Sequence, residues 1–274
     1  MKNILIPTDF SQDSNRTIDY VTMLFKNESC AFYFLNTYTY DISGLNALDM
    51  LQADDEWFDK PKEDSLLQLN DLLISQRIRK NYSNHEYHII SECSSLAKGI
   101  EKQLETLDID LVVLKGDTKL GRKSKSIIGN IRTCPVLLVP VSSAVDDELC
   151  LTITSNFKEK IRMFGVNRFL EALKNTNLKI NILVLGEKKL IGVNVKYNID
   201  LLLNHLKEQA VENVKVEYTG NAFDLKAYAS THLNNIMCVM DEKPDFLRRV
   251  GLSHSSVIPT LENLHNNTVL TIHQ

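Results

Sequence analysis

The segment that decides the fold is DLVVLKGDTKLGRKSKSIIGNIRTCPVLLVP, residues 110–140. Residues 110–114 and 136–139 are short, β-branched apolar runs, which are typical of strands inside a parallel sheet. Between them, Gly129-Asn130 predicts the first turn of a helix, where free amides favour an anion. Ligands bind at the carboxyl ends of the strands in open α/β sheets. The segment therefore predicts a strand, an anion-binding loop and a second strand.

Composition narrows the class of protein. The 274 residues are 43% hydrophobic and 24% charged, which is typical of a soluble globular chain. A net charge of −4 argues against a nucleic-acid or acidic-membrane partner. No apolar run has the length of a membrane span, and the first residues lead directly into a strand rather than a signal peptide. Five scattered cysteines without a C-x-x-C pair predict buried or idle thiols in the cytoplasm.

Strands and helices alternate through the first half, which predicts a parallel sheet with right-handed crossovers. Ser11, Asp13 and Ser14 are candidate caps for the first helix. The elements expected before residue 110 are strands at 3–6, 31–35 and 87–91, and helices at 13–26, 63–80 and 95–107.

Residues 38–61 are too long for an ordinary connection, so they predict either a lid or a partner-facing insertion. Within them, Trp57 and Phe58 would anchor a partner, cover a cleft or pack on their own domain. Packing is the favoured alternative for one large aromatic pair.

The second half repeats the order of the first after the polar linker 141–148. Strands are expected at 149–154, 179–185, 214–218, 235–240 and 268–272, with a helix capped by Ser155-Asn156. Asp9 falls on Asn156 at an offset of 147, and Val112 falls on Met237 at an offset of 125. The difference of 22 is about the size of the 38–61 insertion. The chain is therefore interpreted as two copies of one unit, domains 1–142 and 147–274.

Together with the opening ILIPTDFS, residues 4–11, the segment 110–140 resembles the universal stress protein family. The resemblance implies tandem open parallel sheets of five strands, each flanked by helices and pairing around its fifth strand. Many members bind ATP through an Asp after strand one and a loop of Gly, two residues, Gly, nine residues, Gly, then Ser, Thr or Asn. Gly116, Gly129 and Asn130 fit that loop, while Lys119 takes the place of the middle glycine.

The resemblance implies a site for ATP or another adenine nucleotide in the first domain, with magnesium only alongside the nucleotide. Asp9 would accept a hydrogen bond from adenine or ribose, or else make a turn between strand and helix. The glycines would admit phosphate to the backbone or serve tight strand-to-helix geometry, and Lys119 favours the second alternative. The expected site residues are Thr8, Asp9, Thr37, Gly116, Lys119, Gly129, Asn130 and Ile131.

A group of cations surrounds this loop, namely Lys115, Lys119, Arg122, Lys123, Lys125 and Arg132. One hypothesis is that Lys119 or Lys123 reaches phosphate as a point charge; a solvated loop is the favoured alternative. In the second domain, Asn156 replaces the carboxylate of Asp9, and three acidic residues after 240 would repel a polyphosphate. We expect no nucleotide there.

No metal site or catalytic set is predicted. His85 and His88 are three apart on a strand and so point to opposite faces. The leading expectation is a cytoplasmic stress-response protein that binds nucleotide without efficient turnover. The alternatives are a nucleotide-free interaction protein using 38–61, alone or as a homodimer, and a slow ATP hydrolase. A pyrophosphatase-type enzyme ranks last, because residues 7–11 contain no glycine.

Overall fold

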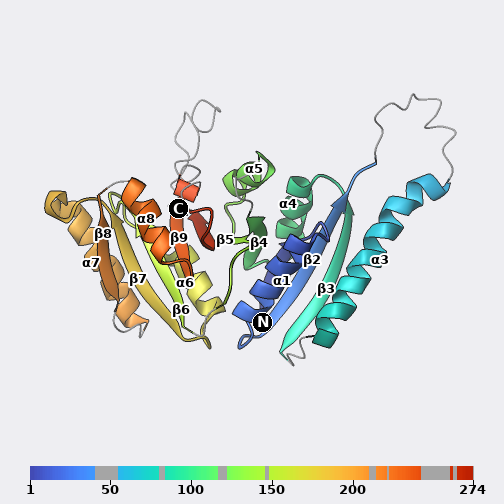
Figure 1. Cartoon of the computed structure of the whole chain (residues 1–274), viewed down its shortest axis with the longest axis horizontal. Coiled ribbons are helices and arrows are strands. Elements are labelled where there is room, and N and C mark those ends of the chain that lie inside the picture. The colour runs from blue at the N-terminus through green and yellow to red at the C-terminus, as the bar shows by residue number, and fades with distance from the viewer. Residues whose placement is uncertain are drawn as a thin grey trace.

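The computed structural model describes residues 1–40, 55–79, 84–116, 122–145, 148–209, 214–220, 222–241, 260–261 and 264–273. Strands and helices alternate along the chain, as predicted (Figure 1). The first half contains β1 Lys2–Pro7, α1 Gln12–Leu24, β2 Cys30–Tyr38, α3 Asp55–Arg79, β3 His85–Cys93, α4 Leu96–Thr106, β4 Leu111–Gly116, α5 Arg122–Asn130 and β5 Val136–Pro140. The second half contains β6 Leu149–Ser155, α6 Met163–Ala172, β7 Leu178–Leu185, the 3-10 turn η1 Lys188–Leu190, α7 Val193–Glu208, β8 Lys215–Thr219, α8 Ala222–Thr231, β9 Asn235–Asp241 and β10 Val269–His273.

The described strands form one sheet in the order β3-β2-β1-β4-β5-β10-β9-β6-β7-β8. All neighbours are parallel except β5 and β10, which pair antiparallel at the centre. The α/β class is confirmed: each half contributes five parallel strands, and the two sets pair through their fifth strands, as the family resemblance implied. This pairing covers two strand edges that would otherwise leave backbone groups unpaired.

Strand register repeats between the halves. Ile4 pairs with Leu111 in the first half, and Leu151 pairs with Ile236 in the second. These pairs differ by offsets of 147 and 125, the values that the sequence predicts. The same comparison matches Leu137 of β5 to Leu270 of β10, and these two residues pair with each other. Matched residues meet in this way on a two-fold axis.

The two halves differ in length between their second and third strands. Tyr33 pairs with His88, whereas the matched residue Asn181 pairs with Lys215, so the first half has 21 more residues here. Part of the predicted 38–61 insertion is helical, because α3 begins at Asp55 rather than near 63. Residues 41–54 lie outside the described residues.

Trp57 and Phe58 pack on their own half. The ring of Trp57 stacks on Tyr40, with 5.4 Å between centroids, and lies edge-on to Phe58. The Tyr40 hydroxyl donates to the backbone carbonyl of Phe58 at 3.0 Å. This aromatic group fixes the first turn of α3 beside the residues that follow β2.

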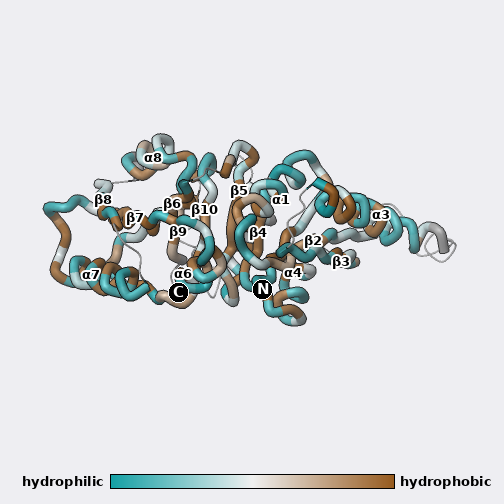
Figure 2. The backbone as a smooth tube through the Cα atoms, turned by 90° about the horizontal axis from the view of Figure 1, so that it is seen from below, coloured by the Kyte–Doolittle hydropathy of each residue, from teal (hydrophilic) through white to brown (hydrophobic). Residues whose placement is uncertain are grey.

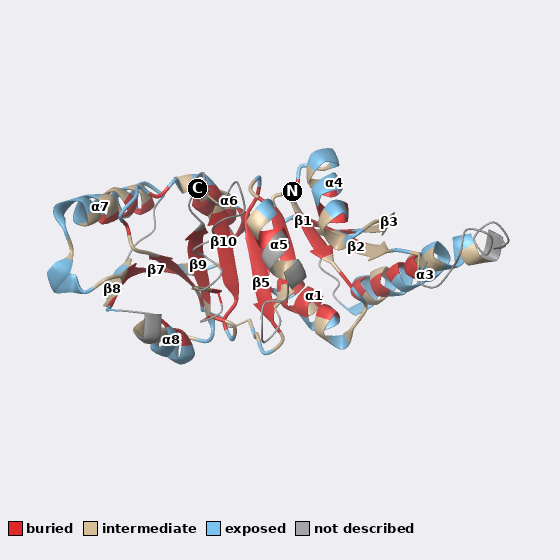
Figure 3. Ribbon diagram, turned by 90° about the horizontal axis from the view of Figure 1, so that it is seen from above, coloured by how far each residue is buried: buried red, intermediate tan, exposed pale blue. Residues whose placement is uncertain are grey.

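Helices cover both faces of the sheet. One apolar cluster joins α1, α3, α6 and α7 to one face, and a second joins α4, α5 and α8 to the other. Both clusters contain residues of both halves, so the core is continuous across the β5–β10 pair. Figure 2 shows hydrophobic residues concentrated in the central strands. Figure 3 shows that these strands are buried, while the outer helices carry exposed faces.

Polar contacts also join the halves. The buried Glu28 carboxylate accepts hydrogen bonds from the Asn175 amide N–H at 2.7 Å, the Asn175 side chain at 2.8 Å and the Thr176 hydroxyl at 3.2 Å. Arg168 of α6 donates from Nε to Asp110 at 3.1 Å. Glu28 and Asn175 are themselves matched at the 147-residue offset, which is expected close to the axis.

Three of the five cysteines, Cys30, Cys134 and Cys238, are buried. Burial raises the thiol pKa of Cys30 and of Cys134 to about 12, which keeps both protonated and inert at neutral pH. Within the part of the chain that the structure describes, no helix combines the length and the apolar character of a membrane span.

Candidate functional site

The candidate site lies between β1 and β4. The chain leaves β1 towards β2 and leaves β4 towards β5, in opposite directions across the sheet. Open α/β sheets bind ligands at such a switch point, outside the carboxyl ends of the strands. We call residues 8–11 together with Lys115 and Gly116 the first mouth.

The Asp9 carboxylate links the two strands of the first mouth. Its Oδ1 accepts from the Ser11 amide at 3.1 Å and the Ser11 hydroxyl at 2.6 Å, and its Oδ2 accepts from the Lys115 ammonium at 2.9 Å. Partial burial raises the pKa of Asp9, but the hydrogen bonds from Ser11 and Lys115 outweigh that effect and hold it well below its ordinary value. Asp9 is thus ionised at neutral pH, and its side chain remains 58% exposed.

A tight turn presents this carboxylate. Phe10 has a φ of 60°, in the left-handed region, and its amide donates to the Thr8 hydroxyl at 3.0 Å. Ser11 is the N-cap of α1 and accepts from the Ser14 amide at 3.2 Å, so this predicted cap is confirmed. Asp9 does make the turn hydrogen bond that was one of its two expected roles.

Thr8 and Thr37 have structural partners. Thr8 is buried, and its amide donates to the Leu35 carbonyl of β2 at 2.8 Å. Thr37 lies on β2 under α4, where a Cβ built on Gly99 would come within 2.7 Å of its methyl carbon. Thr37 therefore contributes to the packing of α4 on the sheet.

Gly116 lies where β4 and β5 end side by side. A Cβ there would meet the backbone nitrogen of Pro140 at 3.1 Å and the carbonyl of Val139 at 3.2 Å. The close contact of the two strands therefore gives this glycine a packing role, whether or not a ligand binds.

The predicted helix start at Gly129-Asn130 is wrong. Helix α5 runs Arg122–Asn130, so these are its last two residues, and its amino end lies at the opposite end of the helix. Ile131 is buried, and its amide donates a hydrogen bond to the backbone carbonyl of Ile127. The apolar positions Ile127, Ile128 and Ile131 have helical spacing, and this pattern, rather than the glycine spacing, marks the helix.

Lys119 lies outside the described residues, as do the side chains of Arg122, Lys123 and Lys125. The phosphate hypothesis for Lys119 and Lys123 therefore stays a prediction. The cation that the structure does bring into the first mouth is Lys115. The sequence alone did not reveal its pairing with Asp9, but the β1–β4 register, Leu5 beside Val112, sets Thr8 beside Lys115.

Residues 155–158, with Met240, form the second mouth, which has the same turn. Phe157 has a φ of 53°, and its amide donates to the Ser155 hydroxyl at 3.1 Å. The Lys158 amide donates to Asn156 Oδ1 at 2.9 Å, as Ser11 does to Asp9. Met240 occupies the position of Lys115, so these two matched positions hold no ion pair.

The fold and the first mouth define an open α/β protein with a charged candidate site at its switch point. Among the described residues, no group of three His, Cys, Asp or Glu side chains is arranged to hold a metal ion.

Comparison with known proteins agrees with this class. The model of the universal stress protein family matches residues 1–140, and the chain belongs to that family. A search among curated proteins returned no significant match. A universal stress protein from Archaeoglobus fulgidus superposes with a TM-score of 0.67 at 12% identity, over 99% of this chain and 96% of that one. A putative universal stress protein from Pseudomonas aeruginosa gives 0.63 at 10% identity, over 100% and 93%. These similarities show that the fold is shared along the whole chain.

Proposed function

We propose that this chain is a cytoplasmic stress-response protein that binds ATP or another adenine nucleotide at the first mouth without efficient turnover. The proposal rests on one observation: an ionised Asp9 and a Lys115 ammonium 2.9 Å apart at the switch point of the sheet. We propose further that 1–142 and 147–274 are two domains, of which only the first binds nucleotide.

The two charges suit the two ends of a nucleotide. Ser11 fixes one oxygen of Asp9, and the exposed carboxylate retains lone pairs for a ribose hydroxyl or an adenine amino group. Lys115 would move from Asp9 to a phosphate, for which an ammonium serves as a point charge. Binding without turnover follows because the described part of the first mouth contains neither a metal-binding carboxylate set nor an unpaired general base.

Calorimetric titration of the full chain with Mg-ATP tests the proposal. We expect binding by the wild type and at least about tenfold weaker binding by Asp9→Ala and by Lys115→Met. Lys98→Met, an exposed lysine of α4, is the matched control and keeps the wild-type affinity. No heat at millimolar Mg-ATP, or equal affinity in Lys115→Met and the wild type, would contradict the proposal.

One further variant tests whether Lys119 contacts phosphate or obstructs it. Lys119→Gly restores the glycine of the family pattern. Affinity for Mg-ATP should fall if Lys119 contacts phosphate and rise if its side chain obstructs the ligand.

A nucleotide-free interaction protein is the second candidate. It is favoured by the packing role of Gly116 at the tight β4–β5 contact and by the place of Gly129 at the end of α5. Under this alternative the aromatic group of Tyr40, Trp57 and Phe58 is the candidate partner surface. A Trp57→Ala variant would then lose partner binding while the wild type shows no response to Mg-ATP.

A further inference from the structure

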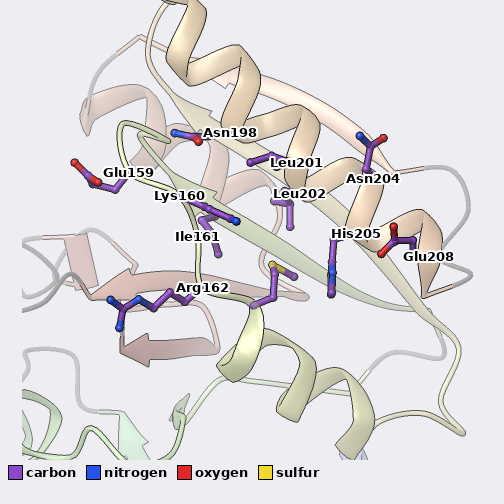
Figure 4. A pocket seen from close by; sticks show the side chains of 11 residues that line it. Glu159, Lys160, Ile161, Arg162, Asn198, Leu201, Leu202, Asn204, His205 and Glu208 are labelled. Carbon is purple, nitrogen blue, oxygen red and sulfur yellow. The ribbon is translucent and has the colours of Figure 1, made fainter.

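A groove in the second half has no part in the first mouth. It lies between the β6–α6 connection and α7, on the face of the sheet that α6 and α7 cover (Figure 4). Its volume is about 1030 Å³, at the upper end of the roughly 300–1,000 Å³ typical of small-molecule sites. The residues that line it are Glu159, Lys160, Ile161, Arg162, Met163, Asn198, Leu201, Leu202, Asn204, His205 and Glu208.

A missing turn of helix opens this groove. In the first half α1 begins at Gln12, whereas α6 begins at Met163, four residues later than its matched position Glu159. The predicted cap at Ser155-Asn156 is therefore wrong. The cap residue Ser11 is matched by Lys158, which has no acceptor for the orphan amides of a first turn. Residues 159–162 are not helical and form one wall of the groove.

The floor of the groove is apolar. Ile161 and Leu202 are buried beneath it, at 6% and 3% exposure, and Met163 and Leu201 extend the apolar surface. Figure 4 shows the Leu202 side chain between the two walls. An apolar surface of this kind binds the hydrocarbon part of a ligand.

Charged side chains lie at both ends of the groove. Lys160 extends across one end, with its ammonium directed towards Leu201 and Leu202 (Figure 4). Glu208 and His205 lie at the other end, where His205 Nε2 contacts Asn167 Oδ1 at 3.0 Å. Glu159 and Arg162 point away from His205, outside the centre of the groove. Lys160 therefore lies beside the apolar floor and apart from the Glu208 carboxylate.

We propose that this groove binds a small amphipathic anion, with a carboxylate head at Lys160 and a hydrocarbon body over Met163 and Leu201. A head paired with Lys160 keeps its remaining oxygen in water, and the body covers apolar surface that water now contacts. A cationic head is disfavoured at this end by Lys160, and a wholly apolar ligand makes no use of that ammonium.

Titration calorimetry of the full chain with decanoate and with decanol tests the groove, because the two probes share a chain and differ in charge. We expect decanoate to bind more tightly than decanol. Lys160→Glu should weaken decanoate binding by at least about tenfold, and Leu201→Trp should abolish it by filling the groove. Lys196→Glu makes the same charge change on α7 outside the groove and should leave binding unchanged.

Unliganded thermal melts of each variant check that it folds. Because the Lys160 side chain is exposed, the Lys160→Glu variant is expected to fold even if the Leu201→Trp variant is destabilised. The first-mouth variant Asp9→Ala should bind decanoate like the wild type, which separates this groove from the nucleotide proposal. Absence of decanoate binding, equal binding of decanol and decanoate, or equal loss in Lys160→Glu and Lys196→Glu would overturn the inference.

Discussion

The first and second mouths share a backbone and differ in chemistry. Thr8 to Ser11 and Ser155 to Lys158 form the same turn, with a left-handed phenylalanine held by a hydroxyl two residues earlier. Asp9 and Lys115 in the first mouth are matched by Asn156 and Met240 in the second. The turn therefore belongs to the fold, while Asn156 and Met240 leave the second mouth without the ion pair that Asp9 and Lys115 form in the first.

A further difference follows from one residue. Ser11 caps α1, and its counterpart Lys158 cannot cap α6, so the second half loses a helical turn and gains a groove. Matched positions in two halves of one sheet thus form different candidate sites. The predictions below test this comparison between the halves, beginning with the contact that joins them.

Glu28→Ala should have the largest effect on stability. It removes a buried carboxylate that accepts from Asn175 and Thr176 across the junction, leaving a backbone amide unsatisfied, at a cost of about 3 kcal/mol. Glu171→Ala is the control, because that exposed side chain only approaches Lys2 at 3.8 Å and should cost under about 1 kcal/mol. Urea unfolding measures both. Similar midpoints for the two variants would mean that the Glu28 contacts do not hold the halves together.

The two candidate glycines should respond in opposite directions. Gly116→Val places carbon against the backbone of Pro140 and Val139 and should cost about 2 kcal/mol, although valine favours strands. Gly129→Ala meets nothing within 4 Å and lies in a helix, so it should add up to about 1 kcal/mol. Both free energies of unfolding come from urea titrations. A wild-type midpoint for Gly116→Val would remove the structural reason for that glycine.

The helix caps give a smaller difference. Ser11→Ala removes the N-cap of α1 and should cost about 1 kcal/mol, whereas Lys158→Ala removes no cap and should be nearly neutral. The comparison is made by urea unfolding at neutral pH. Equal losses in the two variants would contradict the explanation of why α6 begins one turn late.

The smallest effect concerns the Asp9 carboxylate and pH. Its folded pKa lies below the unfolded value of 3.8, so its stabilisation is fully present above that value and is lost as the pH falls through the folded pKa. Since the carboxylate is more than half exposed, Asp9→Asn should cost under about 1 kcal/mol at neutral pH. The difference from the wild type, followed by urea unfolding across acid pH, should shrink as the pH falls. A difference that grows on acidification would be the opposite of this expectation.

Much of the fold could be predicted because its signals are local. Alternating apolar runs predicted the strands, and the 147 and 125 offsets from sequence match the strand register that the structure shows. Helix boundaries were less predictable. The predicted start of α5 was wrong because the prediction followed the spacing of the glycines. The helical spacing of Ile127, Ile128 and Ile131 indicates the helix correctly. The predicted start of α6 was wrong because the Ser155 hydroxyl accepts a hydrogen bond from the Phe157 amide within the turn instead of capping the helix.

The candidate site was predictable only in part. Asp9 and Ser11 follow from the turn chemistry of a strand-to-helix connection. Predicting the place of Lys115 in the site requires the register between β1 and β4. That register depends on contacts between residues more than 100 positions apart in sequence. The groove beside α7 required knowing that a helical turn is absent, and an amphipathic pattern alone does not reveal where a helix starts.

The central claim is that only the first mouth binds nucleotide, and thermal melting with Mg-ATP tests it most directly. The wild type should melt at a higher temperature with ligand, since a ligand at one hundred times its dissociation constant adds about 2.7 kcal/mol. The double variant Asp9→Asn with Lys115→Met, which gives the first mouth the residues of the second at these two positions, should lose that shift. The Asn156→Asp variant in the second mouth should keep the wild-type shift of the melting temperature. An unshifted wild type, or an undiminished shift in the double variant, would contradict the account.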